Sequence, residues 1–324
     1  MAGWDVHTHL IPPTVLAAAR RGDFGLSVED ASLMVDGQHR LPLRRLGDPR
    51  ALLDWVSSQQ LDGAVVSVPP ALFRYDLEGS AAVDWAALVN QGLRELASPQ
   101  LRVLAQLPLL HPEAGSLAAE LAAEGVYSGF ALGTVNSTPG YGASRLDPLW
   151  EVLHAAEAFT LIHPSHSPDE RLDSYYLSNL LGNPYETALA AAGLVFADVP
   201  ARFPGVQFCL SHGGGATAAV AGRWQRGIDT ARPGIKPPSQ SVSAVLQQFY
   251  VDDLVHDNGV LALLGATYGA ERVLAGSDWP FPMGSDQLDL TLVAARAAVS
   301  ELLTRPLGLT SSTRRLRPGC WRRP

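Results

Sequence analysis

The chain has 324 residues, of which 47% are hydrophobic, and a formal net charge of −8. This length and hydrophobic content suit one large domain with a buried core. The acidic balance argues against a nucleic-acid partner, and no run approaches the ~18 apolar residues of a membrane span, so we expect neither kind of partner.

Short strand-like runs alternate along the chain with longer stretches of helical pattern. The expected strands are residues 4–7, 63–68, 102–107, 129–132, 160–163, 206–212, 250–254 and 273–277. The expected helices are residues 49–60, 83–97, 112–123, 147–158, 185–191, 216–228, 259–268 and 285–303. Eight strand–helix units make a closed parallel barrel, so the sequence predicts an α/β fold of the (β/α)₈ TIM-barrel class, whereas a doubly wound open sheet would not need eight units.

Two segments fall outside this alternation. Apolar residues in the stretch 22–45 follow a loose period of two, which we interpret as a small β-insertion after strand one, lying over the active site. Residues 304–324 are rich in Arg and Pro and poor in core residues. We therefore expect a barrel of residues 1–303 followed by an irregular basic tail.

Cysteine usage bears on the compartment. Cys209 and Cys320 are the only cysteines, which is too few for a disulfide framework, and the chain enters its first strand without the pattern of a signal peptide. We expect a cytoplasmic protein, in which Cys209 packs in the core.

Histidines lie at the end of the first expected strand. In Asp5-Val6-His7-Thr8-His9 the two imidazoles are two residues apart, so His7 and His9 point to the same side of the strand. Two imidazoles on one side, at the carboxyl end where barrel active sites are built, are candidate metal ligands. A merely structural pair of histidines is the alternative.

Later strands also end in histidines. The apolar run of strand five stops at His163, which is either a packed core histidine or a third metal ligand. His166 competes for that role, but it lies beyond the strand, and we expect it to line the substrate pocket. His212 precedes three glycines that allow close approach of a ligand, and it is either a fourth ligand or a general acid or base.

A carboxylate ends the last expected strand. A lone buried charge is costly, so Asp278 needs a partner, which a metal ion can supply; an N-cap role is the alternative. Three nitrogen ligands and one carboxylate leave an open coordination position. Strand four supplies neither lysine nor carboxylate, which favours one metal ion over two, and nitrogen-rich ligation favours zinc over manganese.

Together, HTHL near the start, HP after strand five, SHGGG on strand six and GSDWPFP on strand eight resemble the decarboxylase branch of the amidohydrolase superfamily. The likeness is greatest to the 2-amino-3-carboxymuconate-6-semialdehyde decarboxylase family, over about residues 4–290. It implies a zinc-dependent barrel that acts as a homodimer. It also implies that His7, His9, His163 and Asp278 bind the metal, that His212 is the catalytic histidine acting on water at the metal, and that Asp278 relays a proton.

Two arginines and two further residues are candidates for substrate binding. Arg40 lies eight residues before Asp48 and matches an arginine that binds the substrate carboxylate. Arg223 matches an arginine that the family sends into the neighbouring subunit's site. Guanidinium groups suit carboxylate substrates, although each arginine could simply form a surface salt bridge. Trp279 and His166 complete the expected pocket, in which His163-Pro164-Ser165-His166 replaces an HPWD-like stretch of the family.

The function that these residues imply is metal-dependent, non-oxidative decarboxylation of a small conjugated or aromatic carboxylic acid. The same centre could instead serve a zinc-dependent hydrolase of a lactone or amide, which would form a new carboxylate without releasing CO₂. A non-catalytic metal-binding barrel is the third possibility, and the open coordination position beside His212 disfavours it.

Overall fold

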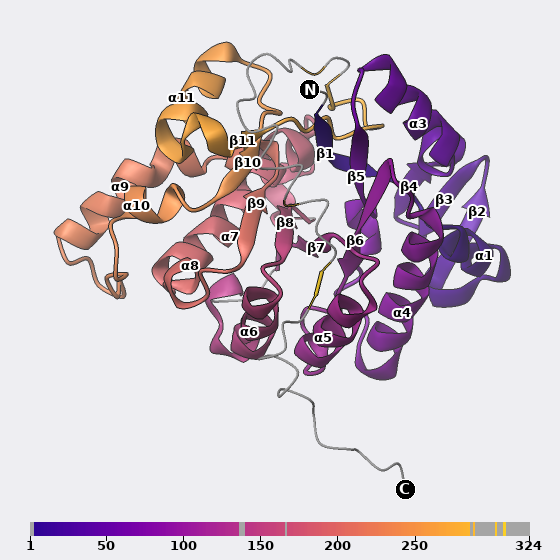
Figure 1. Ribbon diagram of the computed structural model, residues 1–324, viewed down its shortest axis with the longest axis horizontal. Coiled ribbons are helices and arrows are strands. Elements are labelled where there is room, and N and C mark those ends of the chain that lie inside the picture. The colour runs from indigo at the N-terminus through magenta and orange to yellow at the C-terminus, as the bar shows by residue number, and fades with distance from the viewer. Residues whose placement is uncertain are drawn as a thin grey trace, which may run out of the picture.

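A barrel of eight parallel strands dominates the computed structural model, which describes residues 3–135, 140–165, 167–285, 288, 302, 307 and 308. The strands follow one another around the sheet in chain order (Figure 1). They are β1 (Trp4–His9), β5 (Gly63–Ser67), β6 (Leu101–Gln106), β7 (Gly129–Gly133), β8 (Phe159–His163), β9 (Gln207–Leu210), β10 (Tyr250–Asp252) and β11 (Val273–Leu274). The predicted TIM-barrel class is confirmed.

Helices surround these strands, as the sequence pattern predicts (Figure 1). Those that follow the expected pattern are α3 (Pro49–Ser58), α4 (Gly79–Leu96), α5 (Ala114–Glu124), α6 (Asp147–Ala155), α7 (Asn183–Phe196), α9 (Thr217–Asp229) and α11 (Asn258–Tyr268). The structure adds α1 (Pro13–Arg21), α2 (Leu43–Leu46), α8 (Val199–Arg202) and α10 (Val242–Leu246). None of the described helices combines the length and apolar content needed to cross a membrane.

The first strand and the segment after the last strand close the barrel. Val6 N donates to Ala275 O at 2.9 Å, Asp278 N donates to His7 O at 2.8 Å, and His9 N donates to Trp279 O at 2.8 Å. These bonds continue past the end of β11, which is therefore shorter than the predicted strand of residues 273–277. They also bring Asp278 next to the two histidines of β1.

The predicted β-insertion is a three-stranded antiparallel sheet, formed by β2 (Leu26–Glu29), β3 (Ser32–Val35) and β4 (His39–Pro42). It lies against α1. Arg74, in the loop after β5, donates to Phe24 O at 2.8 Å and pairs with Asp36 at 3.2 Å, which ties the insertion to the carboxyl end of the barrel. Its position over the active site stays a prediction.

The end of the chain is described only in part. The predicted helix of residues 285–303 and the predicted tail of residues 304–324 lie almost entirely outside the described residues. Leu307, near the start of that expected tail, is buried, and its backbone N–H donates to Tyr127 O at 3.3 Å.

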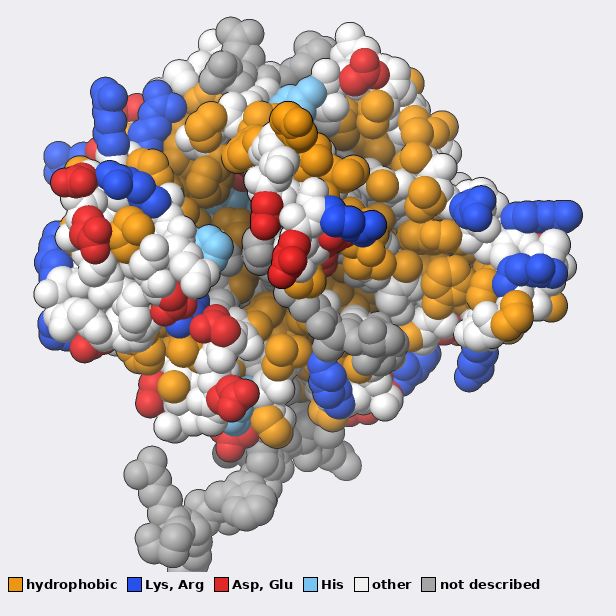
Figure 2. Space-filling view, turned by 180° about the vertical axis from the view of Figure 1, so that it is seen from behind, with side chains coloured by type: hydrophobic (Ala, Val, Ile, Leu, Met, Phe, Trp, Pro, Cys, Tyr) orange, Lys and Arg blue, Asp and Glu red, His pale blue; other side chains and the backbone are white. Residues whose placement is uncertain are grey.

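On the face seen from behind, hydrophobic side chains occupy much of the middle, and Lys and Arg side chains stand out at the two sides (Figure 2). Several of the exposed large hydrophobic residues are close together in the sequence, shortly before and within the first half of α7.

The members of this group are Tyr175, Tyr176, Leu180, Leu181, Tyr185 and Leu189. We call this group the α7 apolar strip.

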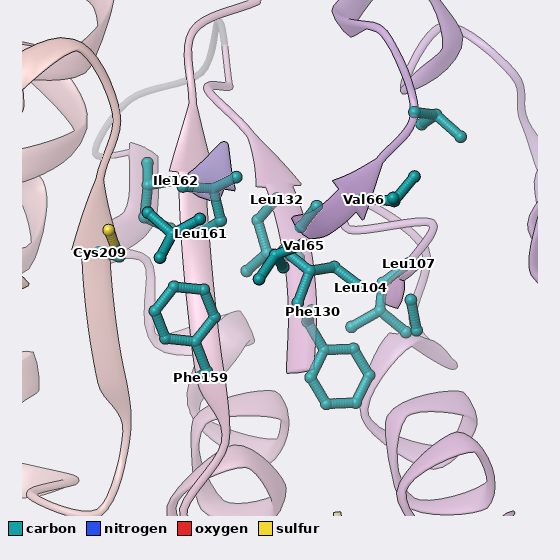
Figure 3. Close-up of a cluster of buried hydrophobic side chains, with 14 of the residues drawn as sticks. Val65, Val66, Leu104, Leu107, Phe130, Leu132, Phe159, Leu161, Ile162 and Cys209 are labelled. Carbon is teal, nitrogen blue, oxygen red and sulfur yellow. The ribbon is translucent and has the colours of Figure 1, made fainter. Parts of the chain in front are cut away.

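The core of the barrel consists of side chains from adjacent strands. Phe130, Phe159 and Ile162 lie among leucines and valines of β5 to β8 (Figure 3). Cys209 of β9 belongs to the same cluster and is a free, buried thiol, as the apolar run around it predicts. Every residue of β5, β7 and β8 is buried, because helices cover the outside of these parallel strands.

Candidate metal centre

Four predicted metal ligands meet at the carboxyl end of the barrel. His7 and His9 lie on β1, His163 ends β8, and Asp278 follows β11. All four side chains are buried, and one potential ligand atom from each lies within 4.8 Å of those of the others. The structure thus brings together residues that are up to 271 positions apart in the chain, and the four can hold a divalent metal ion.

The imidazoles present the same nitrogen to the centre. His9 Nδ1 lies 3.1 Å from Val68 O, and His163 Nδ1 lies 2.8 Å from Pro164 O. Since a carbonyl oxygen only accepts, each Nδ1 carries the proton, and each Nε2 keeps its lone pair. His7 Nδ1 lies 2.8 Å from a carboxylate oxygen of Asp252, with the same result. This arrangement is typical of histidines that bind a metal through Nε2.

The centre fits a cation because lone pairs face each other across it. Nε2 of His7 and Nε2 of His9 are 3.2 Å apart, and Asp278 Oδ1 lies 3.1 Å from His9 Nε2. His163 Nε2 and Asp278 Oδ1 are buried without a hydrogen-bond partner among the described residues. Buried acceptors without a donor are costly, and a positive ion between them removes that cost.

The charges of two of the four side chains, His163 and Asp278, suit metal binding as well. Burial lowers the pKa of His163 well below its usual value, and the neighbouring imidazoles lower it further. Burial raises the pKa of Asp278, but the imidazoles of His7, His9 and His212 outweigh burial, so this pKa falls well below its usual value. Neutral imidazole and ionised carboxylate are the forms that bind a metal.

His212 lies beside the four-residue cluster. It follows β9 in a turn with a φ of +53°, and its Nε2 is 3.6 Å from Asp278 Oδ2. Its side chain is partly exposed, whereas those of His7 and His9 are fully buried. Of the two roles left open by the sequence, this position suits an acid or base that faces the substrate better than a fourth nitrogen ligand.

Two aromatic rings lie near the metal ligands. The ring of Phe281 lies 5.3 Å from that of His9, and the ring of Phe73 lies 6.3 Å from that of His163. Sequence reasoning missed both as pocket residues. The position of Phe281 within GSDWPFP was the one hint for that residue. Phe73 lies six residues after the end of β5, outside every motif that the sequence analysis singled out.

The last residue of the fourth barrel strand, Gly133, has no room for the side chain of a further ligand. A Cβ atom at Gly133, the last residue of β7, would lie 2.7 Å from the ring of Phe73 and 2.7 Å from Ser165 Oγ. The predicted absence of a ligand on this strand therefore has a packing reason. Within the described part of the chain, the four residues are the one group suited to hold a metal ion.

The predicted substrate residues have different surroundings in the single chain. The Arg40 guanidinium on β4 is half exposed, with Ser32 Oγ at 3.1 Å and Asp30 at 3.9 Å. Arg223 is exposed on α9. Trp279 is buried and is fixed through its backbone, whose N–H donates to Ser277 Oγ at 3.0 Å. His166 lies outside the described residues.

Two buried aspartates that sequence reasoning missed support the centre. Asp252, on β10, accepts from His7 and from the His212 turn. Asp5, on β1, accepts from Ser277 N at 3.0 Å and from Trp55 Nε1 at 3.1 Å, and burial raises its pKa. Asp5 stands in the quoted DVHTH stretch, but nothing in the sequence shows that its partners are distant residues.

Three imidazoles and one carboxylate at the carboxyl end of a parallel barrel place the protein in the class of barrel proteins with a candidate metal centre at that end. The family model described as Amidohydrolase matches residues 4–305. The chain therefore belongs to the amidohydrolase family.

Its relatives include named decarboxylases. It is 28% identical over 299 residues to 2-amino-3-carboxymuconate-6-semialdehyde decarboxylase of Dictyostelium discoideum, covering 86% of this chain and 82% of the relative. The apo IDCase of Metarhizium anisopliae has a TM-score of 0.74 at 23% identity and covers 97% of this chain and 96% of its own. Dihydroxybenzoic acid decarboxylase of Polaromonas, solved with manganese and an inhibitor, has a TM-score of 0.73 at 18% identity. The match covers 94% of this chain and 97% of the Polaromonas chain.

Proposed function

We propose that this chain is a metal-dependent, non-oxidative decarboxylase of a small conjugated or aromatic carboxylic acid. The observation that carries the proposal is the four-residue group of His7, His9, His163 and Asp278. His212 lies beside this group, and the rings of Phe73 and Phe281 lie near its histidines. Aromatic walls favour a flat, unsaturated substrate. The decarboxylase relative that matches along 86% of the chain supports the reaction class.

The side chains have separate tasks in this reaction. When bound, the divalent metal supplies a Lewis acid that polarises substrate oxygens and lowers the pKa of water. Loss of CO₂ leaves the electron pair of the broken C–C bond on the substrate carbon, and that carbon must then receive a proton. His212 Nε2, which lies 3.6 Å from Asp278 Oδ2 at the edge of the cluster, is the side chain placed to deliver that proton.

Zinc is the proposed metal, since three imidazoles and a single carboxylate form a nitrogen-rich set. The manganese in the structure of the Polaromonas relative makes manganese the competing choice. Two measurements decide between zinc and manganese. The first is the metal content of protein purified without added metal, and the second is the activity of metal-free protein after it is reloaded with each ion. We expect the zinc-loaded protein to be active and would give up zinc if only manganese restored turnover.

Product analysis tests the reaction. The purified holoenzyme, offered 2-amino-3-carboxymuconate-6-semialdehyde and a set of hydroxybenzoates, should release one CO₂ per substrate consumed. H212N should keep its metal, and its kcat should be lower than that of the wild type by a factor of about 10² to 10⁴, because a proton donor is missing. A new carboxylate without CO₂ from a lactone or amide would instead indicate the hydrolase. Metal that stabilises the fold while no substrate of either class turns over would indicate the non-catalytic barrel.

Arg40 and Arg223 remain the proposed carboxylate-binding residues. Among the described residues, the Arg40 guanidinium contacts Ser32 Oγ and, at longer range, the exposed Asp30, and its half-exposed side chain has room to turn toward a substrate. Arg223 is exposed on α9, which suits an arginine that serves the site of a second copy of the chain. Two guanidinium groups would bind a dicarboxylate such as carboxymuconate semialdehyde more tightly than a monoacid.

The α7 apolar strip supports a homodimer. Leu181, Tyr185 and Leu189 repeat every four residues and form one exposed face of a helical segment. Exposed apolar groups of this size mark interaction surfaces. Helix α7 packs against α9, so pairing of two copies through this strip would also bring each Arg223 toward the other subunit. We also propose a cytoplasmic location, in line with the free thiol of Cys209.

A further inference from the structure

One buried carboxylate touches both functional parts of the centre. Asp252 lies on β10, between β9 and β11 in the sheet, and its exposure is 0%. Its Oδ2 lies 2.8 Å from His7 Nδ1 and 2.9 Å from the backbone N of His212. Its Oδ1 accepts from Gly213 N at 2.8 Å and more weakly from Leu254 N at 3.3 Å. Both oxygens are thus fully used by donors from three different segments.

The bond to His7 fixes the imidazole. A carboxylate can only accept, so His7 must carry a proton on Nδ1 and leave Nε2 for the metal. Val68 O and Pro164 O do the same for His9 and His163 through neutral backbone carbonyls. His7 alone among the three has a charged partner, which makes its ring a stronger donor of electrons to the metal.

The bonds to the turn fix His212. His212, Gly213 and Gly214 have φ values of +53°, +60° and +75°, and a non-glycine residue in this region costs about 1 to 3 kcal/mol. Such a conformation persists only where the surroundings hold it. Consecutive N–H groups of His212 and Gly213 both point at Asp252, which therefore holds the turn and with it the position of the His212 ring.

The packing around Asp252 shows how closely it approaches the centre. A Cβ atom at Gly276 would lie 2.6 Å from the Asp252 Cβ and 3.1 Å from the His7 Cβ. Glycine at this position lets Asp252 and the metal ligand His7 lie side by side.

We propose that Asp252 is the positioning residue that joins the metal ligand His7 to the turn carrying His212. Through it, the geometry of metal binding and the geometry of proton delivery depend on one side chain. The inference rests on the proposed decarboxylase function, but it does not depend on which acid is the substrate.

The first arm of the test is metal affinity, measured on the full-length protein by competition with a chromogenic chelator. D252N should bind zinc about 10- to 100-fold more weakly than the wild type, because an asparagine cannot accept from His7 and from Gly213 at once. D253N is the matched control: it removes the neighbouring carboxylate, which accepts from Gly276 N and touches no histidine. Equal zinc affinity of D252N and D253N would overturn the proposal.

The second arm is a double-mutant cycle in kcat at saturating metal. D252N should lower kcat about tenfold in the wild-type background and have almost no effect in the H212N background, because its influence on the reaction passes through His212. A purely structural role predicts the same factor in both backgrounds, and that result would overturn the proposal. If wild-type protein released no CO₂ with any metal, the proposed function would fail, while the affinity ranking would still test Asp252.

If D252N does not fold, the wild type can be tested directly. In metal-free protein with ¹⁵N-labelled histidine, His7 should show an Nδ1–H proton, and the amides of His212 and Gly213 should exchange slowly although they lie in a turn. A His7 ring protonated on Nε2 alone, or fast exchange of both amides, would overturn the proposal.

Discussion

Asp253 shows what burial does to a single side chain at this end of the barrel. It follows β10 directly, and its carboxylate accepts from Gly276 N at 2.9 Å. Burial raises its pKa to about 7, and the nearby carboxylates of Asp252 and Asp5 add to the effect. One hydrogen bond does not offset the loss of water around a charge, so the protonated form is favoured in the folded protein.

Asp253 should therefore make the protein less stable as pH rises. Its pKa in the folded state, about 7, exceeds the ordinary value of 3.8, so the folded protein holds this proton more tightly than the unfolded chain. The stabilisation is fully present below about pH 4 and is lost as pH rises through 7. D253N, which keeps an acceptor for Gly276, should exceed the wild type in unfolding free energy by on the order of 2 to 4 kcal/mol at pH 8, and by much less at pH 5.

Urea unfolding of both proteins at pH 5 and pH 8 measures this difference. Groups other than Asp253 titrate equally in both proteins and cancel in the comparison. If the difference in unfolding free energy between D253N and the wild type were the same at both pH values, the prediction would be wrong.

At the scale of elements, Arg74 explains how a small sheet stays attached to a large barrel. Its side chain is 5% exposed and pairs with Asp76 at 2.9 Å and with Asp36 at 3.2 Å, besides donating to Phe24 O. It also lies over the ring of Trp85 at 5.9 Å. The loop after β5, the insertion and α4 therefore meet at one guanidinium group.

R74A should loosen the insertion without disturbing the barrel. We expect a loss of about 1 to 3 kcal/mol in unfolding free energy, because a buried hydrogen-bonded cation is removed, and faster proteolytic cleavage within residues 22–45. R171A is the control, since the Arg171–Asp169 pair is exposed and should contribute little. Equal cleavage rates in the two variants would show that Arg74 does not hold the insertion.

The sequence predicts the barrel strands well, because strands buried on both faces form apolar runs that stop abruptly. It does not predict α1, whose start at Pro12-Pro13 is typical of a loop, although proline is also common in the first turn of a helix. The strands predicted at 206–212 and 273–277 proved shorter, since their last residues already turn into the metal centre. The local sequence pattern cannot tell whether such a residue still belongs to the strand or already belongs to the turn that follows it.

The same limit applies to the centre. Spacing on one strand suggests that His7 and His9 share a side, and strand-end position adds His163 and Asp278. Asp252 escapes such reasoning, because it is 245 residues away from His7, its hydrogen-bond partner, and stands next to a second aspartate with a different environment. Only the closed barrel shows which of the two faces the metal ligands.

At the scale of the whole molecule, the metal ligands come from the first, fifth and last strands of the barrel. A bound ion therefore links parts of the chain that fold far apart in sequence. Chelation should lower the midpoint of thermal unfolding, and reloading should restore it. At a free metal concentration about 1,000 times Kd, the stabilisation is about 4 kcal/mol. Calorimetry of apo and holo protein measures it, and identical midpoints would argue against a buried site.

The proposed dimer predicts a distinct pair of outcomes. L181E combined with Y185E places charge in the α7 apolar strip and should yield a monomer by sedimentation. V28E, on β2 and well separated from α7 in Figure 1, should leave the assembly unchanged. A double variant that stays dimeric would assign the interface to another surface.

Arg223 allows a test of catalysis across that interface. If it serves the second subunit, R223A and H212N should each be inactive, yet a mixed dimer should regain turnover, because one of its two sites receives an intact Arg223 and keeps its own His212. Refolding or co-expression of the two variants, followed by an assay of CO₂ release, checks this. A mixture no more active than its parts would show that Arg223 does not serve the second subunit's site.

The contact between Gly133 and Phe73 limits how this scaffold could be redesigned. Grafting a bridging lysine onto the end of β7, to convert the protein into a two-ion enzyme, would fail on steric grounds unless Phe73 were first exchanged for a small residue and Ser165 gave way. That exchange would in turn strip one wall from the substrate pocket. The number of ions and the shape of the pocket are therefore traits that this chain can change only together.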